Sequence, residues 1–151
     1  MNDVPEPLLR VSHLHTQFST EAGLVRAVED LAEGLRGRGY TVDVTTDGMP
    51  VGPATDAERV AFGAVRELVA NVVKHSGATS VRLALSRADD WITAVVTDDG
   101  TGFDTAAAEQ RLAAGHIGLA SQRLRVEAAG GQLDAARAEP HGMRMTVTLP
   151  A

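Results

Sequence analysis

Four polar residues of the kinds that hold metals and phosphates recur along one stretch of the chain: Glu67, Asn71, Lys74 and His75. On a helix that turns about 100° per residue, the last three lie roughly 40°, 340° and 80° from Glu67, so all four share one face. A carboxylate and a carboxamide one turn apart offer oxygen ligands for Mg²⁺, and the amine and imidazole beyond them suit phosphate. The alternative is the ordinary solvated face of an amphipathic helix.

A second chemical feature is an aspartate at the end of an expected strand. Apolar side chains alternate along residues 92–97, and Asp98 continues their buried face. Because a buried carboxylate needs hydrogen-bond partners, Asp98 is a candidate acceptor for an amino group on a ligand ring. Gly100 and Gly102 would let the backbone approach that ligand closely. Asp99 points to the other face and is expected to be solvated. The alternative is a plain Asp-Gly turn.

A glycine-rich stretch, residues 115–119, stands where a helix over residues 118–129 is expected to begin. Free main-chain N–H groups and the helix dipole favour phosphate at such a start. The candidates there are Gly115, His116, Gly118 and Leu119. An N-terminal turn before an ordinary helix explains the same pattern. His13 and His15 are assigned surface or packing roles, because imidazoles two residues apart on a helix do not face each other.

Hydrophobic periodicity predicts the elements that position these residues. Helices are expected over residues 8–18, 24–35, 56–74 and 118–129, and strands over residues 40–46, 81–87, 91–97, 132–137 and 143–149. Residues 88–90 form a hairpin turn and residues 99–116 a long loop. This order predicts an α+β fold: a two-layer α/β sandwich whose mixed, mostly antiparallel sheet is covered on one face by helices. Neither the Rossmann nor the P-loop glycine motif occurs.

Composition limits the class of protein. The chain has 151 residues, 44% of them apolar, a net charge of −6, no cysteine, and one Trp, one Tyr and three Phe. We expect an N-terminal segment, residues 1–20, and a single domain, residues 21–151. The acidic charge argues against a nucleic-acid binder, and the lack of cysteine excludes a disulfide scaffold and a thiolate zinc site. Without a membrane-spanning run or a secretory signal, the prediction is a soluble cytoplasmic domain without membrane contact.

Together, the three clusters resemble one known family. Residues 66–78, RELVANVVKHSGA, resemble the N-box of the GHKL ATP-binding domains, and residues 98–103, DDGTGF, resemble their first glycine box. Residues 115–131, GHIGLASQRLRVEAAGG, look like the second box of sensor histidine kinases of the NarL, LiaS and DesK type. The resemblance covers residues 56–150. It implies the Bergerat ATP-binding fold, which agrees with the sheet expected from periodicity.

The resemblance implies roles at the phosphates, with ATP and Mg²⁺ as the bound groups. Asn71 would ligate Mg²⁺ between the phosphates of ATP, and Glu67 would support the metal shell or its water. These two residues form the implied catalytic set. Lys74 and His75 would lie near the phosphates. All four roles fall on the helix face described above.

At the base, the resemblance implies that Asp98 accepts from the adenine amino group and that Gly100 and Gly102 let the loop pass the base. Residues 103–117 would be the ATP lid. The second box supplies the remaining nucleotide-binding candidates: Gly115 and Gly118 as hinges of that lid, with His116 and Leu119.

The sequence departs from the family pattern at two places. Gly142-Met143 stands where the family often has Gly-Thr, which implies an altered contact to the base. Gln122 and Leu124 replace a Met and a Glu that are common after the second box, a change that concerns helix packing more than chemistry.

Kinases of this branch carry a helical hairpin whose phospho-accepting histidine precedes an acidic residue, whereas neither His13 nor His15 does. The resemblance therefore implies an ATP-binding catalytic domain that donates the γ-phosphoryl group to a histidine on a separate dimerisation domain, in the same protein or another chain. A response regulator would follow, with no nucleic-acid partner. The alternatives are an anti-sigma-factor-like serine kinase and a non-catalytic nucleotide-binding or docking module. The chain is interpreted as a fragment or a short stand-alone protein.

Overall fold

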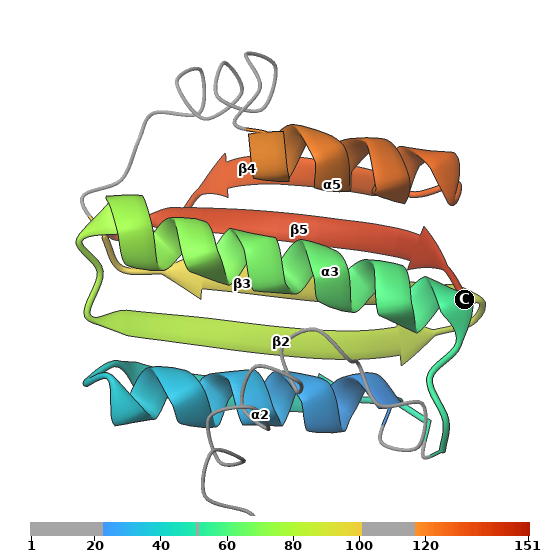
Figure 1. Cartoon of the computed structure of the whole chain (residues 1–151), viewed down its shortest axis with the longest axis horizontal. Coiled ribbons are helices and arrows are strands. Elements are labelled where there is room, and N and C mark those ends of the chain that lie inside the picture. Colours follow the sequence, from blue (N-terminus) through green and yellow to red (C-terminus); the bar gives the residue numbers. More distant parts are fainter. Residues whose placement is uncertain (1–22, 51, 101–116) are drawn as a thin grey trace, which may run out of the picture.

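The computed structural model describes residues 23–50, 52–100 and 117–151 (Figure 1). In chain order, the elements of that part are α2 (Gly23–Gly37), β1 (Thr41–Asp47), α3 (Asp56–Asn71), the π-helical turn η1 (Val72–Ser76), β2 (Ser80–Ala88), β3 (Trp91–Asp98), α5 (Ile117–Ala128), β4 (Gln132–Arg137) and β5 (Met143–Pro150). No helix in these ranges is long and apolar enough to cross a membrane. The expected helix over 8–18, the boundary at residue 20 and most of the loop over 99–116 lie outside the described residues.

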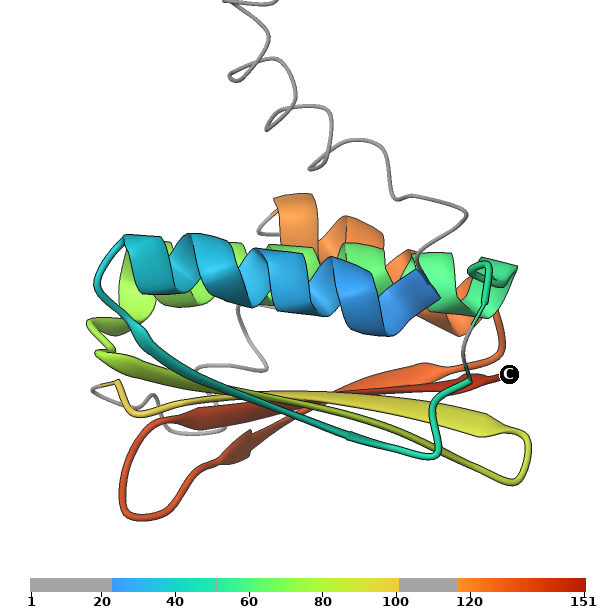
Figure 2. The ribbon, with the colours of Figure 1, turned by 90° about the horizontal axis from the view of Figure 1, so that it is seen from below.

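The strands form one mixed sheet in the order β1-β2-β3-β5-β4. β1 and β2 pair in parallel and are connected through α3, whereas the other neighbours pair antiparallel. Figure 2 shows α2, α3 and α5 on the same face of the sheet. The predicted two-layer sandwich, with a mixed and mostly antiparallel sheet covered on one face, is confirmed.

The core forms because the strands alternate in polarity. Six inward-facing residues of the central hairpin are at most 2% exposed: Val81, Leu83, Leu85, Ile92, Ala94 and Val96. Burial of each large aliphatic side chain contributes about 1.5–3 kcal/mol. The register aligns Leu83 with Val96 on this inner face, under the helices. Asp89, at φ 55, lies in the predicted hairpin turn, which is confirmed.

The first turns of α2 and α3 are joined by a buried carboxylate. Thr55 caps α3 by accepting from the main-chain N–H of Glu58 at 3.2 Å. The Glu58 side chain, 2% exposed, accepts from the N–H of Leu24 at 3.1 Å and so satisfies a free donor at the start of α2. One Thr-x-x-Glu pattern therefore fixes where both helices begin.

The prediction of a regular α-helix as far as Lys74 is wrong in its last turn. The α-helix ends at Asn71, and residues Val72–Ser76 form the π turn η1, which ends at Gly77 with φ 67. The Ser76 hydroxyl donates to the carbonyl oxygen of Val72 at 2.8 Å and accepts from the Ala78 N–H at 3.0 Å. A 3.6-residue period cannot anticipate a turn stabilised by side-chain bonds of this kind.

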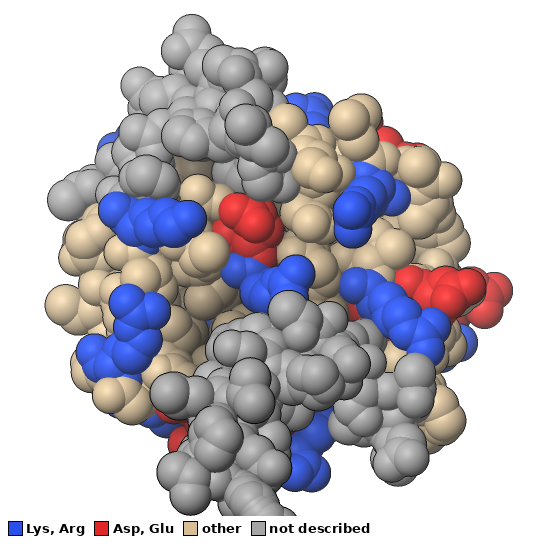
Figure 3. All heavy atoms as spheres, viewed as in Figure 1, with Lys and Arg blue, Asp and Glu red and all other residues tan. Residues whose placement is uncertain are grey.

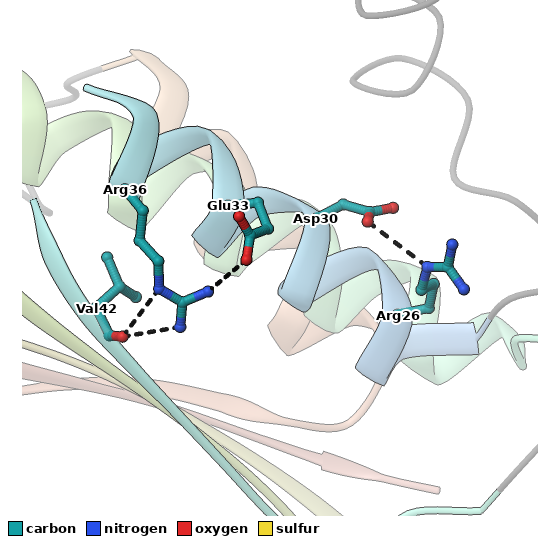
Figure 4. Close-up of polar contacts among 5 residues, drawn as sticks. All are labelled: Arg26, Asp30, Glu33, Arg36 and Val42. Atoms are coloured by element: carbon teal, nitrogen blue, oxygen red, sulfur yellow. Dashed lines mark hydrogen bonds and ion pairs between the residues drawn. The ribbon is translucent and has the colours of Figure 1, made fainter. Parts of the chain in front are cut away.

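α2 is fastened to the edge strand β1 by an arginine (Figure 4). The Arg36 guanidinium donates to the carbonyl oxygen of Val42 from Nε at 3.3 Å and from Nη2 at 2.8 Å. Its Nη1 donates to Glu33 at 2.9 Å, in an exposed ion pair that contributes little by itself. Arg36 thus provides a hydrogen-bond donor for the carbonyl oxygen of Val42, which would otherwise be unpaired at the edge of the sheet.

Candidate functional site

Asp98 ends β3 as a buried carboxylate, 6% exposed, on the face predicted from alternation. Its Oδ1 accepts from the main-chain N–H of Gly100 at 2.8 Å. Burial raises the pKa of Asp98 above its usual value, and the N–H groups of Gly100 and Met143 partly oppose that rise. The result is a fixed acceptor held by main-chain donors.

Asp99 lies on the other face from Asp98 and is partly exposed, as predicted, and it also accepts hydrogen bonds that the sequence did not predict. Its Oδ1 accepts from the N–H groups of Thr79 and Ser80 at 2.9 Å each, and its Oδ2 accepts from the Thr79 hydroxyl at 3.1 Å. These bonds, led by that of the Ser80 N–H, lower the pKa of Asp99. Asp99 ties the start of β2 to the end of β3 and thereby stabilises the position of its neighbour Asp98.

Gly100 lies where the end of β3 meets η1. A Cβ at this position would overlap the carbonyl oxygen of Ser76 and would stand 2.8 Å from the Ser76 Cβ and 2.9 Å from Oδ1 of Asp98. The sequence analysis expected Gly100 to let the backbone approach a ligand closely. In the structure, the close neighbour of Gly100 is the protein's own π turn. This contact brings the last turn after α3 to the end of β3, at one end of the sandwich (Figure 1).

Glu67 and Asn71 lie one turn apart on α3, and both are half-buried. The Asn71 side chain donates from Nδ2 to the main-chain oxygen of Glu67 at 2.9 Å. Since Nδ2 is engaged in the helix, Oδ1 is the side-chain atom that could serve as a ligand. Lys74 is exposed, and the side chain of His75 is outside the described residues.

The remaining predicted site residues are only partly covered by the structure. Gly102, Gly115 and His116 lie outside the described residues. Gly118 and Leu119 fall in the first turn of α5, which begins one residue earlier than predicted, and the Leu119 side chain is not described.

Two residues of the β4–β5 turn lie beside Asp98 and Gly100: Gly142, which the sequence analysis connected with the base contact, and His141, which it missed. Gly142, at φ 110, packs so closely on the main chain that a Cβ would overlap the carbonyl oxygen of Asp98. The ring Nδ1 of His141 lies 3.0 Å from the carbonyl oxygen of Gly100. The Gly-Met pair at the start of β5 pointed to this turn, but nothing in the sequence singled out His141.

The expectation that Gln122 concerns helix packing agrees with its position between α5 and α3. A Cβ on Gly63 of α3 would stand 3.1 Å from Oε1 of Gln122. That Oε1 is buried and has no hydrogen-bond partner among the described residues. Leu124, two residues further along α5, is 67% exposed.

The charged side chains visible on the helical face do not gather into one patch of a single sign (Figure 3). Figure 3 shows basic side chains on the helical face separated by uncharged and acidic surface. In residues 23–50, 52–100 and 117–151, no three His, Cys, Asp or Glu side chains gather to hold a metal. A metal at Asn71 would therefore take most of its ligands from phosphate oxygens and water, as Mg²⁺ commonly does.

Comparison with known proteins gives a consistent result. The family model described as "Histidine kinase-, DNA gyrase B-, and HSP90-like ATPase" matches residues 56–151. The chain is 41% identical over 138 residues to the sensor histidine kinase NarS of Mycobacterium tuberculosis. That alignment covers 91% of this chain but 32% of NarS, so the chain spans about a third of this relative.

Solved structures show the same fold. The ATP-binding domain of PrrB from Mycobacterium tuberculosis is similar with a TM-score of 0.61 and 27% identity, over 81% of this chain and 90% of that one. A histidine kinase domain from the blue-light activated histidine kinase of Erythrobacter litoralis has a TM-score of 0.67 over 84% of this chain and 64% of that one. At 19% identity, the second likeness concerns the fold alone.

Proposed function

Because this chain belongs to the histidine kinase-, DNA gyrase B- and HSP90-like ATPase family, we propose that it binds Mg·ATP and donates the γ-phosphoryl group to a histidine on a separate dimerisation domain. The observation that carries the proposal is that Gly100, which donates to the buried acceptor Asp98, packs against the π turn that follows Glu67 and Asn71. A base-binding acceptor and a metal-binding face thus lie on elements that touch.

Asp98 is proposed to recognise the base. A carboxylate held by main-chain N–H groups can accept from the amino group of adenine but offers no donor to the carbonyl oxygen that guanine has at the same position. Removing such an acceptor from a buried site leaves the ligand donor unsatisfied. Asp98 therefore supports a preference for ATP over GTP.

Asn71 and Glu67 are proposed to serve the phosphate end. Oδ1 of Asn71 would ligate Mg²⁺, and Glu67 would support the metal or its water. Mg²⁺, when bound, supplies neutralising charge to the phosphates. Lys74 and His75 would add donors, which an acidic domain with a net charge of −6 needs in order to hold a nucleotide.

The roles of five residues rest on the sequence resemblance: Gly102, Gly115, His116, Gly118 and Leu119. They are proposed to contact the nucleotide or to border the lid of residues 103–117. The start of the domain at residue 21 and membership of the NarL, LiaS and DesK branch are likewise proposals.

The phosphoryl acceptor is proposed to be a histidine-containing dimerisation domain, which would pass the phosphoryl group to a response regulator. The proposed location is the cytoplasm, where ATP is available. NarS and a second relative, ComP of Bacillus subtilis, are both named as sensor histidine kinases, which supports histidine over serine as the acceptor. No observation favours the serine kinase or the non-catalytic module.

Incubation with γ-labelled ATP and Mg²⁺ tests the proposal. This chain alone should remain unlabelled, because neither His13 nor His15 is followed by an acidic residue. A histidine-bearing dimerisation domain added in trans should acquire an acid-labile label. A stable label on this chain alone would contradict the proposed division of roles.

A further inference from the structure

The main chain of Gly100 is held on both sides by side chains from different parts of the sequence. Its N–H donates to Oδ1 of Asp98 at 2.8 Å, and its carbonyl oxygen lies 3.0 Å from Nδ1 of His141. A carbonyl oxygen can only accept, so Nδ1 of His141 must carry the proton and donate. The contact therefore requires a proton on Nδ1 of His141.

The turn that carries His141 is itself fixed against the base-binding strand. The Ala138 N–H donates to the carbonyl oxygen of Gly142 at 3.0 Å, which closes the turn between β4 and β5. Gly142, at φ 110, packs on the carbonyl oxygen of Asp98 with no room for a Cβ. Main-chain packing thus sets the position of residue 141 relative to Asp98. From this position the imidazole can donate to the carbonyl oxygen of Gly100.

His141 is exposed, so its ring fills no part of the hydrophobic core. The ring is hydrogen-bonded to the carbonyl oxygen of Gly100, which lies 41 positions away in the sequence. What that contact controls is the backbone of a glycine, the residue with the widest choice of conformations. The bond from His141 therefore adds a constraint on this glycine to the one that its N–H bond to Asp98 provides.

We propose that His141 is a positioning residue for nucleotide binding: by donating to the Gly100 carbonyl, it holds the turn that presents the Asp98 carboxylate to the base. The inference rests on the proposed function, because it assigns His141 a part in the same base-binding site. Its role is indirect, since Asp98 makes the contact to the ligand.

Three substitutions separate positioning from a merely structural role. His141→Asn places an amide nitrogen three bonds from Cα, as Nδ1 is in histidine. His141→Gln places the amide nitrogen four bonds from Cα, as Nε2 is. His141→Ala removes the donor. We expect the Ala and Gln variants to bind Mg·ATP about three- to tenfold more weakly, the range that loss of one hydrogen bond gives. The Asn variant should bind within about twofold of wild type by the same measure.

The measurement is calorimetric titration of ATP in Mg²⁺ buffer, with thermal unfolding of each variant alongside. Long-range ¹H–¹⁵N NMR of the nucleotide-free protein should show His141 as the Nδ1–H tautomer. Three results would overturn the inference while leaving the proposed function intact. They are an Nε2–H tautomer at His141, equal ATP affinity of wild type and the Ala variant, and equal weakening of ATP binding in all three variants. A wild type that does not bind ATP would overturn the proposed function, and this inference with it.

Discussion

The side chain of Asn71 donates to the main-chain oxygen of Glu67 at 2.9 Å, which restricts the orientation of the amide. With Nδ2 engaged in the helix, Oδ1 is the atom of this side chain that remains for a cation. A carboxamide oxygen and a carboxylate, both half-buried and one turn apart, offer oxygen ligands to a divalent cation without forming a protein-only cage.

Replacing Asn71 should therefore abolish the metal dependence of nucleotide binding. In Asn71→Ala, Oδ1 and Nδ2 are both lost, and ATP affinity in Mg²⁺ should fall at least about tenfold, the loss that follows removal of a ligand contact to a charged group. Titrations of wild type and variant with ATP, in Mg²⁺ and in EDTA, measure this. Equal affinity of the two proteins in Mg²⁺ would reject Asn71 as a metal ligand.

Lys74 is the only lysine in the sequence, which makes its proposed position near the phosphates directly measurable. An acyl-phosphate derivative of ATP acylates an amine that lies beside the phosphates and releases ATP. We expect modification at Lys74, suppressed by excess ATP and absent in Lys74→Arg, which keeps the charge but removes the reactive amine. Mass spectrometry identifies the site. Modification at the N-terminal amine alone, with Lys74 untouched, would place Lys74 away from the phosphates.

Asp99 should make stability depend on pH. Hydrogen bonds from Ser80 and Thr79 lower its pKa below the usual 3.8, so its contribution is present above pH 3.8 and is lost as pH falls through the lower, folded value. Asp99→Asn should cost about 1 kcal/mol at pH 7, a modest value because solvent screens the site. Urea unfolding of both proteins between pH 7 and pH 3 measures the difference, which should shrink toward acid pH. A constant difference would contradict this assignment.

Gly142 should tolerate no side chain. In Gly142→Ala, the new Cβ would overlap the carbonyl oxygen of Asp98, and alanine would have to adopt the φ of 110 that Gly142 has. We expect the free energy of unfolding to fall by about 1–3 kcal/mol. The matched control is Gly34→Ala, because a Cβ at that helical position meets nothing within 4 Å. Alanine there should stabilise α2 by up to about 1 kcal/mol. Denaturant unfolding compares the two, and equal effects would show that the contact with Asp98 does not matter.

The sequence could predict the elements and the direction of Asp98 because both follow from local periodicity. Alternation along β3 places Asp98 on the buried face, and the 3.6-residue repeat places Glu67 and Asn71 on one face of α3.

What the sequence could not predict depends on contacts between distant residues. The π turn is held by Ser76 hydrogen bonds that compete with the regular helix. Asp99 was correctly separated from the face of Asp98, but its partners Thr79 and Ser80 lie on another strand. His141 reaches Gly100 across 41 positions, a pairing that no periodicity encodes.

The central claim is that this acidic domain binds Mg·ATP through Asp98 and the polar face of α3. Calorimetric titration of wild type with ATP and with GTP in Mg²⁺ buffer tests this claim most directly. We predict one saturable site for ATP, with a Kd between about 1 µM and 1 mM, as for typical enzyme substrates. GTP should bind at least about tenfold more weakly, because a carboxylate cannot donate to its base carbonyl. No saturable ATP binding, or GTP affinity equal to that of ATP, would contradict the claim.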